Sequence, residues 1–284
     1  MATVTSGLAS PTAVPARRRK AGLAGTLRSE LTKIRSVRST YVSLVLMVLA
    51  SVVWSVAFNA GTAAHWSHMS AQARSGIDPT QSSVLGLALL GQLVIVVLGA
   101  LTITSEYSTG MIRTSLSSMP RRGTLFAAKG VVFGAVALVT GVVTSFLAFF
   151  VGQAILSSQH VNTTLGHSGV LREVIGGGLF LAVTGLMSFG IGAMLRHSAG
   201  AIASGIGLMF VLMILTNFLP SPPSGWFGQA DIDKWIPFFA GAHIWQNQLI
   251  GINPFSVWVG FGVFCAYAAA AIIGGFVMFV RRDA

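Results

Sequence analysis

The residues best placed to do chemistry in this chain lie between two apolar runs, from Glu106 to Lys129. Glu106 stands where one apolar run ends, and several arginines and apolar side chains follow it. Apolar side chains can fill a groove on a soluble partner while arginines orient the contact by charge. The residue pattern of this connection therefore predicts that it docks onto a soluble partner. The alternative interpretation is that its arginines are ordinary solvated charges beside a membrane.

Individual positions of this connection have distinct expected roles. Gly110 permits a tight turn or a close backbone approach, and Glu106 is expected to pair with a nearby arginine. Met111, Ile112 and Leu116 would form the apolar side of a short docking helix. The candidate docking residues are Glu106, Tyr107, Gly110, Met111, Ile112, Arg113, Arg121 and Arg122.

Catalytic and metal chemistry have little support in the sequence. The chain has no G-x-x-x-x-G-K-[ST] segment, so any ATP must be bound by another chain. His65 and His68 offer two ligands at helical spacing, which is fewer than a stable zinc site requires. The single cysteine, Cys265, excludes an internal disulfide. We therefore expect neither a catalytic residue nor a metal site.

Polar residues inside the apolar runs are candidates for a path that an amphipathic substrate follows. No acidic or basic residue falls near the middle of a run, which argues against a proton relay. Arg172 and Glu173 lie at the edge of a run and are expected at the membrane interface. The candidate path residues are Gln92, Gln153, Thr184 and Asn217.

Six apolar runs must position these residues. Hydrophobic residues make up 53% of the chain and charged residues only 9%, against about a quarter charged in soluble domains. Each run is long enough for a helix to cross a bilayer, which needs about 20 residues. Continuous apolar character favours helices over alternating barrel strands. The sequence thus predicts an all-α membrane protein with spans near 41–61, 83–105, 130–156, 174–195, 199–219 and 255–280.

The distribution of positive charge predicts the orientation of these spans. With six spans, 15 of the 18 Lys and Arg residues fall on the side of the N-terminus. Loops rich in Lys and Arg stay in the cytoplasm, so both termini are predicted to be cytoplasmic. Anionic lipid then explains the net charge of +11, and no nucleic-acid partner is needed.

The segments outside the spans divide the chain further. Residues 1–22 are predicted to be a disordered basic tail, and residues 23–40 an amphipathic helix at the inner interface, because Leu23, Leu27, Leu31 and Ile34 recur at helical spacing. A basic leader held only by charge is the alternative. The remainder, 41–284, forms the six-helix domain, with a coupling loop at 106–129 and an outer loop at 220–254 that contains short helices.

The E-Y-S-T-G-M-I-R stretch from Glu106 to Arg113, followed by the P-R-R-G turn at 120–123, resembles the cytoplasmic loop of type-2 ATP-binding cassette (ABC) transporter permeases. The S-E-L-T-K-I-R-S segment at 29–36 resembles the entry helix of that family, and Arg281-Arg282-Asp283 resembles its common terminus. The resemblance extends from about Leu23 to the end of the chain.

This resemblance implies a bacterial plasma-membrane permease that exports a drug, antibiotic, peptide or lipid-like molecule. Two cytoplasmic ATPase subunits would hold ATP and Mg²⁺, with no cofactor in this chain, and the permease would pair with a second copy or a related chain. The competing interpretation is a non-transporting scaffold, sensor or immunity protein that recruits a partner through the same loop.

Overall fold

The computed structural model describes residues 23–112, 122–218, 229–246 and 255–281. These residues are predominantly helical and contain no strand, which confirms the predicted all-α class. The predicted basic tail 1–22, Arg113, Arg121 and parts of the predicted loop 220–254 lie outside the described residues.

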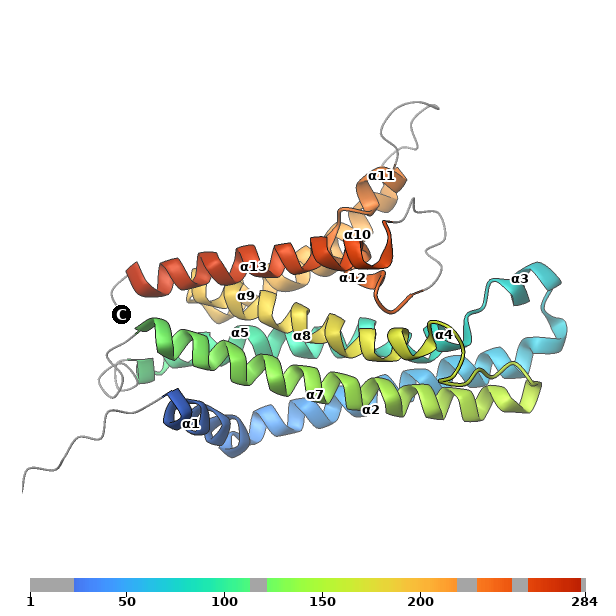
Figure 1. Ribbon diagram of the computed structural model, residues 1–284, viewed down its shortest axis with the longest axis horizontal. Coiled ribbons are helices and arrows are strands. Elements are labelled where there is room, and N and C mark those ends of the chain that lie inside the picture. Colours follow the sequence, from blue (N-terminus) through green and yellow to red (C-terminus); the bar gives the residue numbers. More distant parts are fainter. Residues whose placement is uncertain (1–22, 113–121, 219–228, 247–254, 282–284) are drawn as a thin grey trace, which may run out of the picture.

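Six helices among the described residues are long and apolar enough to cross a bilayer, as predicted. They run side by side along the long axis of the molecule (Figure 1). Two of them contain a single π-helical turn, η2 and η4. The six are α2 (Arg38–His65) with η1 (Trp66–His68); α4 (Pro79–Gly86), η2 (Leu87–Gly91) and α5 (Gln92–Ser108); α7 (Arg122–Leu156) with η3 (Ser157–Gln159); α8 (Val170–Leu195); α9 (Ser198–Ile206), η4 (Gly207–Val211), α10 (Leu212–Leu215) and η5 (Thr216–Phe218); and α13 (Val257–Arg281).

Shorter helices lie outside these spans. The predicted entry helix is α1 (Leu23–Ser36), and extended backbone at Val37 separates it from α2. α3 (Ala71–Ser75) follows the first span, and α11 (Gln229–Asp233) with α12 (Pro237–Ala242) forms the predicted short helices before the last span. We call the end of the bundle with α1 and the end of α13 the α1 end, and the opposite one the α3 end (Figure 1).

The helix α8 lies at the centre of the bundle and packs against α5, α7 and α13. Glycines make this close packing possible. A Cβ atom at Gly178 would lie 2.6 Å from the backbone nitrogen of Val142 in α7, and one at Gly190 would lie 2.7 Å from the backbone nitrogen of Ile272 in α13. Small residues let helix backbones approach in the membrane, where packing replaces the hydrophobic effect between helices.

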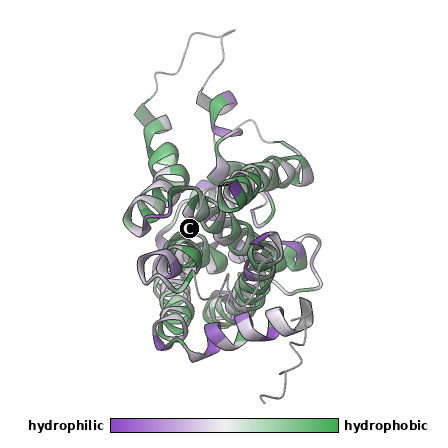
Figure 2. Cartoon of the chain, turned by 90° about the vertical axis from the view of Figure 1, so that its left-hand side faces the viewer, coloured by the Kyte–Doolittle hydropathy of each residue, from purple (hydrophilic) through white to green (hydrophobic). Residues whose placement is uncertain are grey.

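The outer surface of the bundle is apolar. Tyr41 and Val53 of α2 and Ile273 of α13 are each more than 60% exposed, and the cartoon seen from the α1 end is coloured as hydrophobic along most of its helices (Figure 2). Such continuous apolar surface is unstable in water but matches lipid tails. The chain is therefore a multi-pass membrane protein.

One boundary of the predicted coupling loop differs from the structure. α7 begins at Arg122, not near Gly130, so the last part of the predicted loop 106–129 is helical and Lys129 is a buried helical residue. Hydropathy marks where a helix is apolar, whereas the helical hydrogen bonds of α7 continue through its polar first turns, which contain no proline after Arg122.

Candidate functional site

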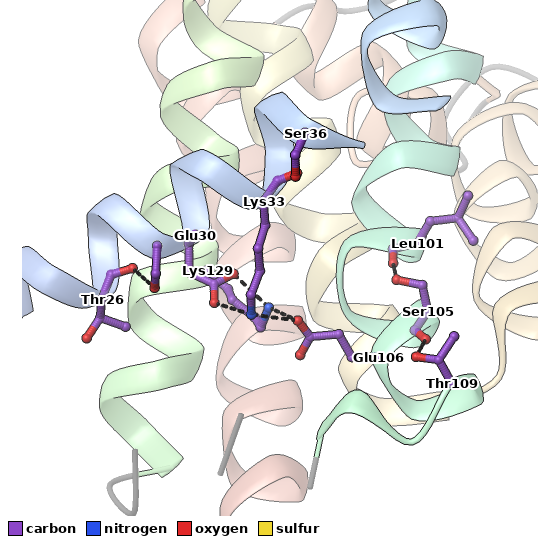
Figure 3. A network of polar contacts seen from close by, with 10 residues as sticks. Thr26, Glu30, Lys33, Ser36, Leu101, Ser105, Glu106, Thr109 and Lys129 are labelled. Atoms are coloured by element: carbon purple, nitrogen blue, oxygen red, sulfur yellow. Dashed lines mark hydrogen bonds and ion pairs between the residues drawn. The ribbon is translucent and has the colours of Figure 1, made fainter. Parts of the chain in front are cut away.

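Four charged side chains meet at the α1 end of the bundle. The Lys129 amine contacts Glu30 Oε2 at 2.8 Å and Glu106 Oε1 at 2.6 Å. The Lys33 amine contacts Glu30 Oε1 at 2.9 Å and Glu106 Oε1 at 3.2 Å. We call Glu30, Lys33, Glu106 and Lys129 the charge network (Figure 3). Two carboxylates and two amines alternate, so the network carries no net charge.

Three helices that are distant in sequence supply this network. α1 contributes Glu30 and Lys33, α5 contributes Glu106 near its C-terminal end, and α7 contributes Lys129. α1 lies against α7 with Thr26 and Glu30 as its most buried described side chains. The α1 side chains that are buried against the bundle are thus polar, and the position of this helix at the inner interface stays a prediction.

The electrostatics of the network depend on burial. The side chains of Lys129, Glu30 and Glu106 are 2%, 6% and 8% exposed, whereas that of Lys33 is 37% exposed. Buried charges are tolerated only when partners replace their lost hydration. Burial lowers the pKa of Lys33, but its hydrogen bond to Glu30 and the field of Glu106 outweigh that effect, so the pKa is raised from 10.5. The fold therefore favours the charged form of this amine.

The partners of Glu106 differ from those expected. We predicted an arginine, and the structure places two lysines against Glu106 instead. Neither lysine is close to Glu106 in the sequence, because Lys33 is 73 residues away and Lys129 is 23 residues away. Two clues were nevertheless present. Glu30 is an isolated acidic residue in a basic segment, and Lys129 is an isolated charge beside an apolar run.

Tyr107 joins α5 to two other helices at the same end. Its ring makes an edge contact with Phe279 of α13, with the ring centroids 6.4 Å apart. The Arg196 guanidinium lies 4.8 Å from the centroid of the same ring and donates a hydrogen bond to the Met278 carbonyl at 3.0 Å. Arg196 follows the last residue of α8 in a left-handed conformation. Sequence reasoning had counted Arg196 only as a positive charge and missed this role.

The start of the 106–122 connection changes direction at a glycine. α5 ends at Ser108, and Gly110 has a φ of +71°, which L-residues other than Asn and Asp seldom adopt. Met111 is then 46% exposed, but Ile112 is 3% exposed and packs into the core of this chain. Ile112 thus cannot fill a partner's groove in this conformation. Arg122 opens α7, and Arg113 and Arg121 lie outside the described residues.

The four candidate path residues have different surroundings. Gln153 is fully engaged, because its Nε2 donates to the Pro79 carbonyl at 2.9 Å and its Oε1 accepts from the Thr163 backbone at 2.8 Å. Thr184 donates to the Phe180 carbonyl within α8.

Gln92 differs from both of these residues. It is fully buried directly after the π turn η2, and neither end of its amide has a hydrogen-bond partner in the structure. Asn217 lies in η5, and its side chain is outside the described part of the chain. Among the residues that the structure describes, no hydrogen bond joins Gln92, Gln153 and Thr184.

The comparison with known families decides the identity of the bundle. Residues 26–218 match the family described as ABC-2 family transporter protein. The match begins in α1 and includes every member of the charge network. The chain belongs to the ABC-2 transporter family. A search of curated proteins found no match.

Membership of the ABC-2 family fixes the general role of this chain. It is the membrane-spanning permease subunit of an ABC transporter, and its partner is an ABC ATPase. The described residues contain no group of three or more His, Cys, Asp or Glu side chains that could hold a metal ion.

Proposed function

We propose that this ABC-2 permease works in export and couples ATP hydrolysis in a separate cytoplasmic ATPase to the efflux of a drug, antibiotic, peptide or lipid-like molecule. ATP and Mg²⁺ are held by the ATPase, which is present in two copies. The permease pairs with a second copy of itself or with a related chain in a bacterial plasma membrane. The observation that carries the proposal is the charge network at the origin of the 106–122 connection.

The charge network gives that connection a rigid mechanical link to the bundle. Glu106 stands four residues before Gly110, and through Lys129 and Glu30 it is tied to α7 and to α1. Its neighbour Tyr107 is tied to α8 and α13 through Arg196 and Phe279. A displacement of the connection is therefore passed to four helices at once, since packed elements move as bodies and do not deform continuously.

ATP supplies the driving force in this scheme. The ATPase dimer closes when it binds ATP, and its motion displaces the 106–122 connection in each permease. The permease then shifts between inward and outward access, because nucleotide binding favours one of the two states. Met111 and the arginines at 113, 121 and 122 form the docking surface. Ile112 instead anchors the connection to the permease core.

Docking of a cytoplasmic ATPase at the α1 end also sets the orientation of the bundle in the membrane. The α1 end faces the cytoplasm, in agreement with the predominance of Lys and Arg on the side of the N-terminus. Along the path between the membrane halves, Gln92 is the candidate that we assign to substrate, because a buried amide without a partner gains from any ligand that supplies hydrogen bonds.

The test is reconstitution of the permease with its ATPase in liposomes of defined sidedness. We expect ATP-dependent movement of substrate away from the ATPase side. In Arg113→Glu and Arg121→Glu, docking should weaken by about tenfold or more, because loss of a buried charged contact costs about 2 to 5 kcal/mol. The matched control is Arg74→Glu, at the α3 end. Normal docking and transport in both loop variants would overturn the coupling role, and ATPase binding without any transport would point to a scaffold.

A further inference from the structure

A pocket of about 250 Å³ opens at the α3 end, remote from the charge network. It lies at the N-terminal ends of α4 and α8 and beside the connection between η3 and α8. Its buried lining includes Thr80 and Glu173, whereas Ser75, His167 and Ser168 are exposed at its rim. The lining contains two carboxylates, Asp78 and Glu173, and no lysine or arginine.

The two carboxylates are used differently by the fold. Asp78 caps α4, because its Oδ1 accepts hydrogen bonds from the backbone nitrogens of Thr80 at 2.8 Å and Gln81 at 3.1 Å. Glu173 is only 1% exposed. Its Oε1 contacts Arg172 at 3.3 Å, and its Oε2 is buried without a hydrogen bond. One carboxylate oxygen at the pocket thus lacks the partner that a buried charge requires.

We propose that this pocket binds a primary ammonium group. An ammonium is a compact cation with three hydrogen-bond donors. The Glu173 carboxylate provides one acceptor group, Asp78 provides the second negative charge, and the hydroxyls of Thr163 and Ser168 provide further acceptors. Arg172 contacts Glu173 but does not line the pocket, so a cation in the pocket neutralises the negative charge of its lining.

Other ligand classes fit the lining less well. An anion would face two carboxylates, which already occupy the positively polarised N-terminal ends of α4 and α8. A metal ion would need more ligands than the described residues bring together. A quaternary ammonium has no N–H group and is recognised by aromatic cages, whereas the pocket lining holds no phenylalanine, tyrosine or tryptophan.

Two sources can present this group at a membrane surface, a soluble amine and the headgroup of phosphatidylethanolamine. The experiment uses the full chain in nanodiscs of phosphatidylcholine and measures equilibrium binding of radiolabelled ethanolamine. We expect saturable binding that methylamine displaces and tetramethylammonium does not. Glu173→Gln keeps the shape of the side chain but removes its charge, and should weaken binding at least tenfold. Asp231→Asn, a carboxylate outside the pocket, should change nothing.

A second variant covers the case in which Glu173→Gln does not fold. Asp78→Asn keeps an oxygen that can cap α4, and it too should weaken ethanolamine binding. Displacement of ethanolamine by phosphatidylethanolamine in the disc would assign the headgroup, and lack of displacement would assign a soluble amine. Absence of saturable binding, equal binding by the neutral variants, or displacement by tetramethylammonium would overturn the proposal. No ATPase takes part, so a failure here leaves the export proposal untouched.

Discussion

Replacement of Lys129 by methionine tests the charge network most directly. The Lys129 side chain is 2% exposed and its amine contacts Glu30 at 2.8 Å and Glu106 at 2.6 Å. Methionine keeps most of the side-chain volume but removes the positive charge. Two buried carboxylates then share only the half-exposed amine of Lys33. We expect a large loss of stability, because breaking one side of a buried ion pair leaves a charge without compensation.

The magnitude follows from burial. Removal of one partner from a buried pair costs about 3 to 5 kcal/mol. The matched variant is Lys33→Met, which removes an amine with the same two partners but 37% exposure. Exposed pairs contribute at most about 1 kcal/mol. For a chain of this size, about 1 kcal/mol shifts the melting temperature by roughly 2 to 4 °C. The expected losses are therefore about 6 to 20 °C for Lys129→Met and less than about 4 °C for Lys33→Met.

The assay follows thermal unfolding of the purified chain in detergent with a maleimide dye that reports exposure of Cys265, the only cysteine. Combining Lys129→Met with Glu30→Gln and Glu106→Gln should recover much of the lost stability, because the one network charge that remains, Lys33, is 37% exposed and can be solvated. The reasoning is refuted if the two lysine variants melt at the same temperature, or if the triple variant is no more stable than Lys129→Met alone.

Three further expectations can be checked independently. Burial lowers the pKa of His243 in the folded chain below 6.5. The neutral imidazole therefore contributes stability above pH 6.5, and this contribution is lost as the pH falls through the pKa of the folded state. His243→Gln should remove this acid sensitivity from melting curves. Gly190→Val should lower the melting temperature, since its side chain would collide with α13 and overpacking costs about 1 to 3 kcal/mol, whereas Gly262→Val, with open space around it, should not. Once the native cysteine is replaced by serine, an impermeant reagent should label Gly166→Cys but not Ser118→Cys from outside intact cells, and the reverse pattern would invert the orientation.

The spans were predictable because their signal is local. Each apolar run must satisfy its own backbone hydrogen bonds in lipid, so length and hydropathy are sufficient to indicate a helix. The ends of the helices were less predictable. α7 continues to Arg122 through residues that hydropathy assigns to a loop, and the break between α1 and α2 at Val37 has no apolar signal.

The candidate site was predictable only in part. The order of Glu106, Tyr107 and Gly110 marked the segment, and the structure gives each a distinct position: an ion pair, a ring contact and a left-handed turn. The partners of these residues were not predictable, because they come from α1, α7, α8 and α13. The opposite exposure of Met111 and Ile112 also depends on how the chain turns after Gly110.

The sequence by itself determined that the chain lies in a lipid bilayer, that it is helical and how many spans it has. It also marked the segment that resembles the family. These properties depend on composition and on residue order over a few turns of helix. The tertiary structure decided which charges neutralise one another. Glu30 meets Lys129 across 99 residues, and Glu173 lines a pocket at the α3 end. The physical reason is that a buried charge is tolerated only with partners at hydrogen-bond distance, and the packing of helices remote in sequence sets those distances.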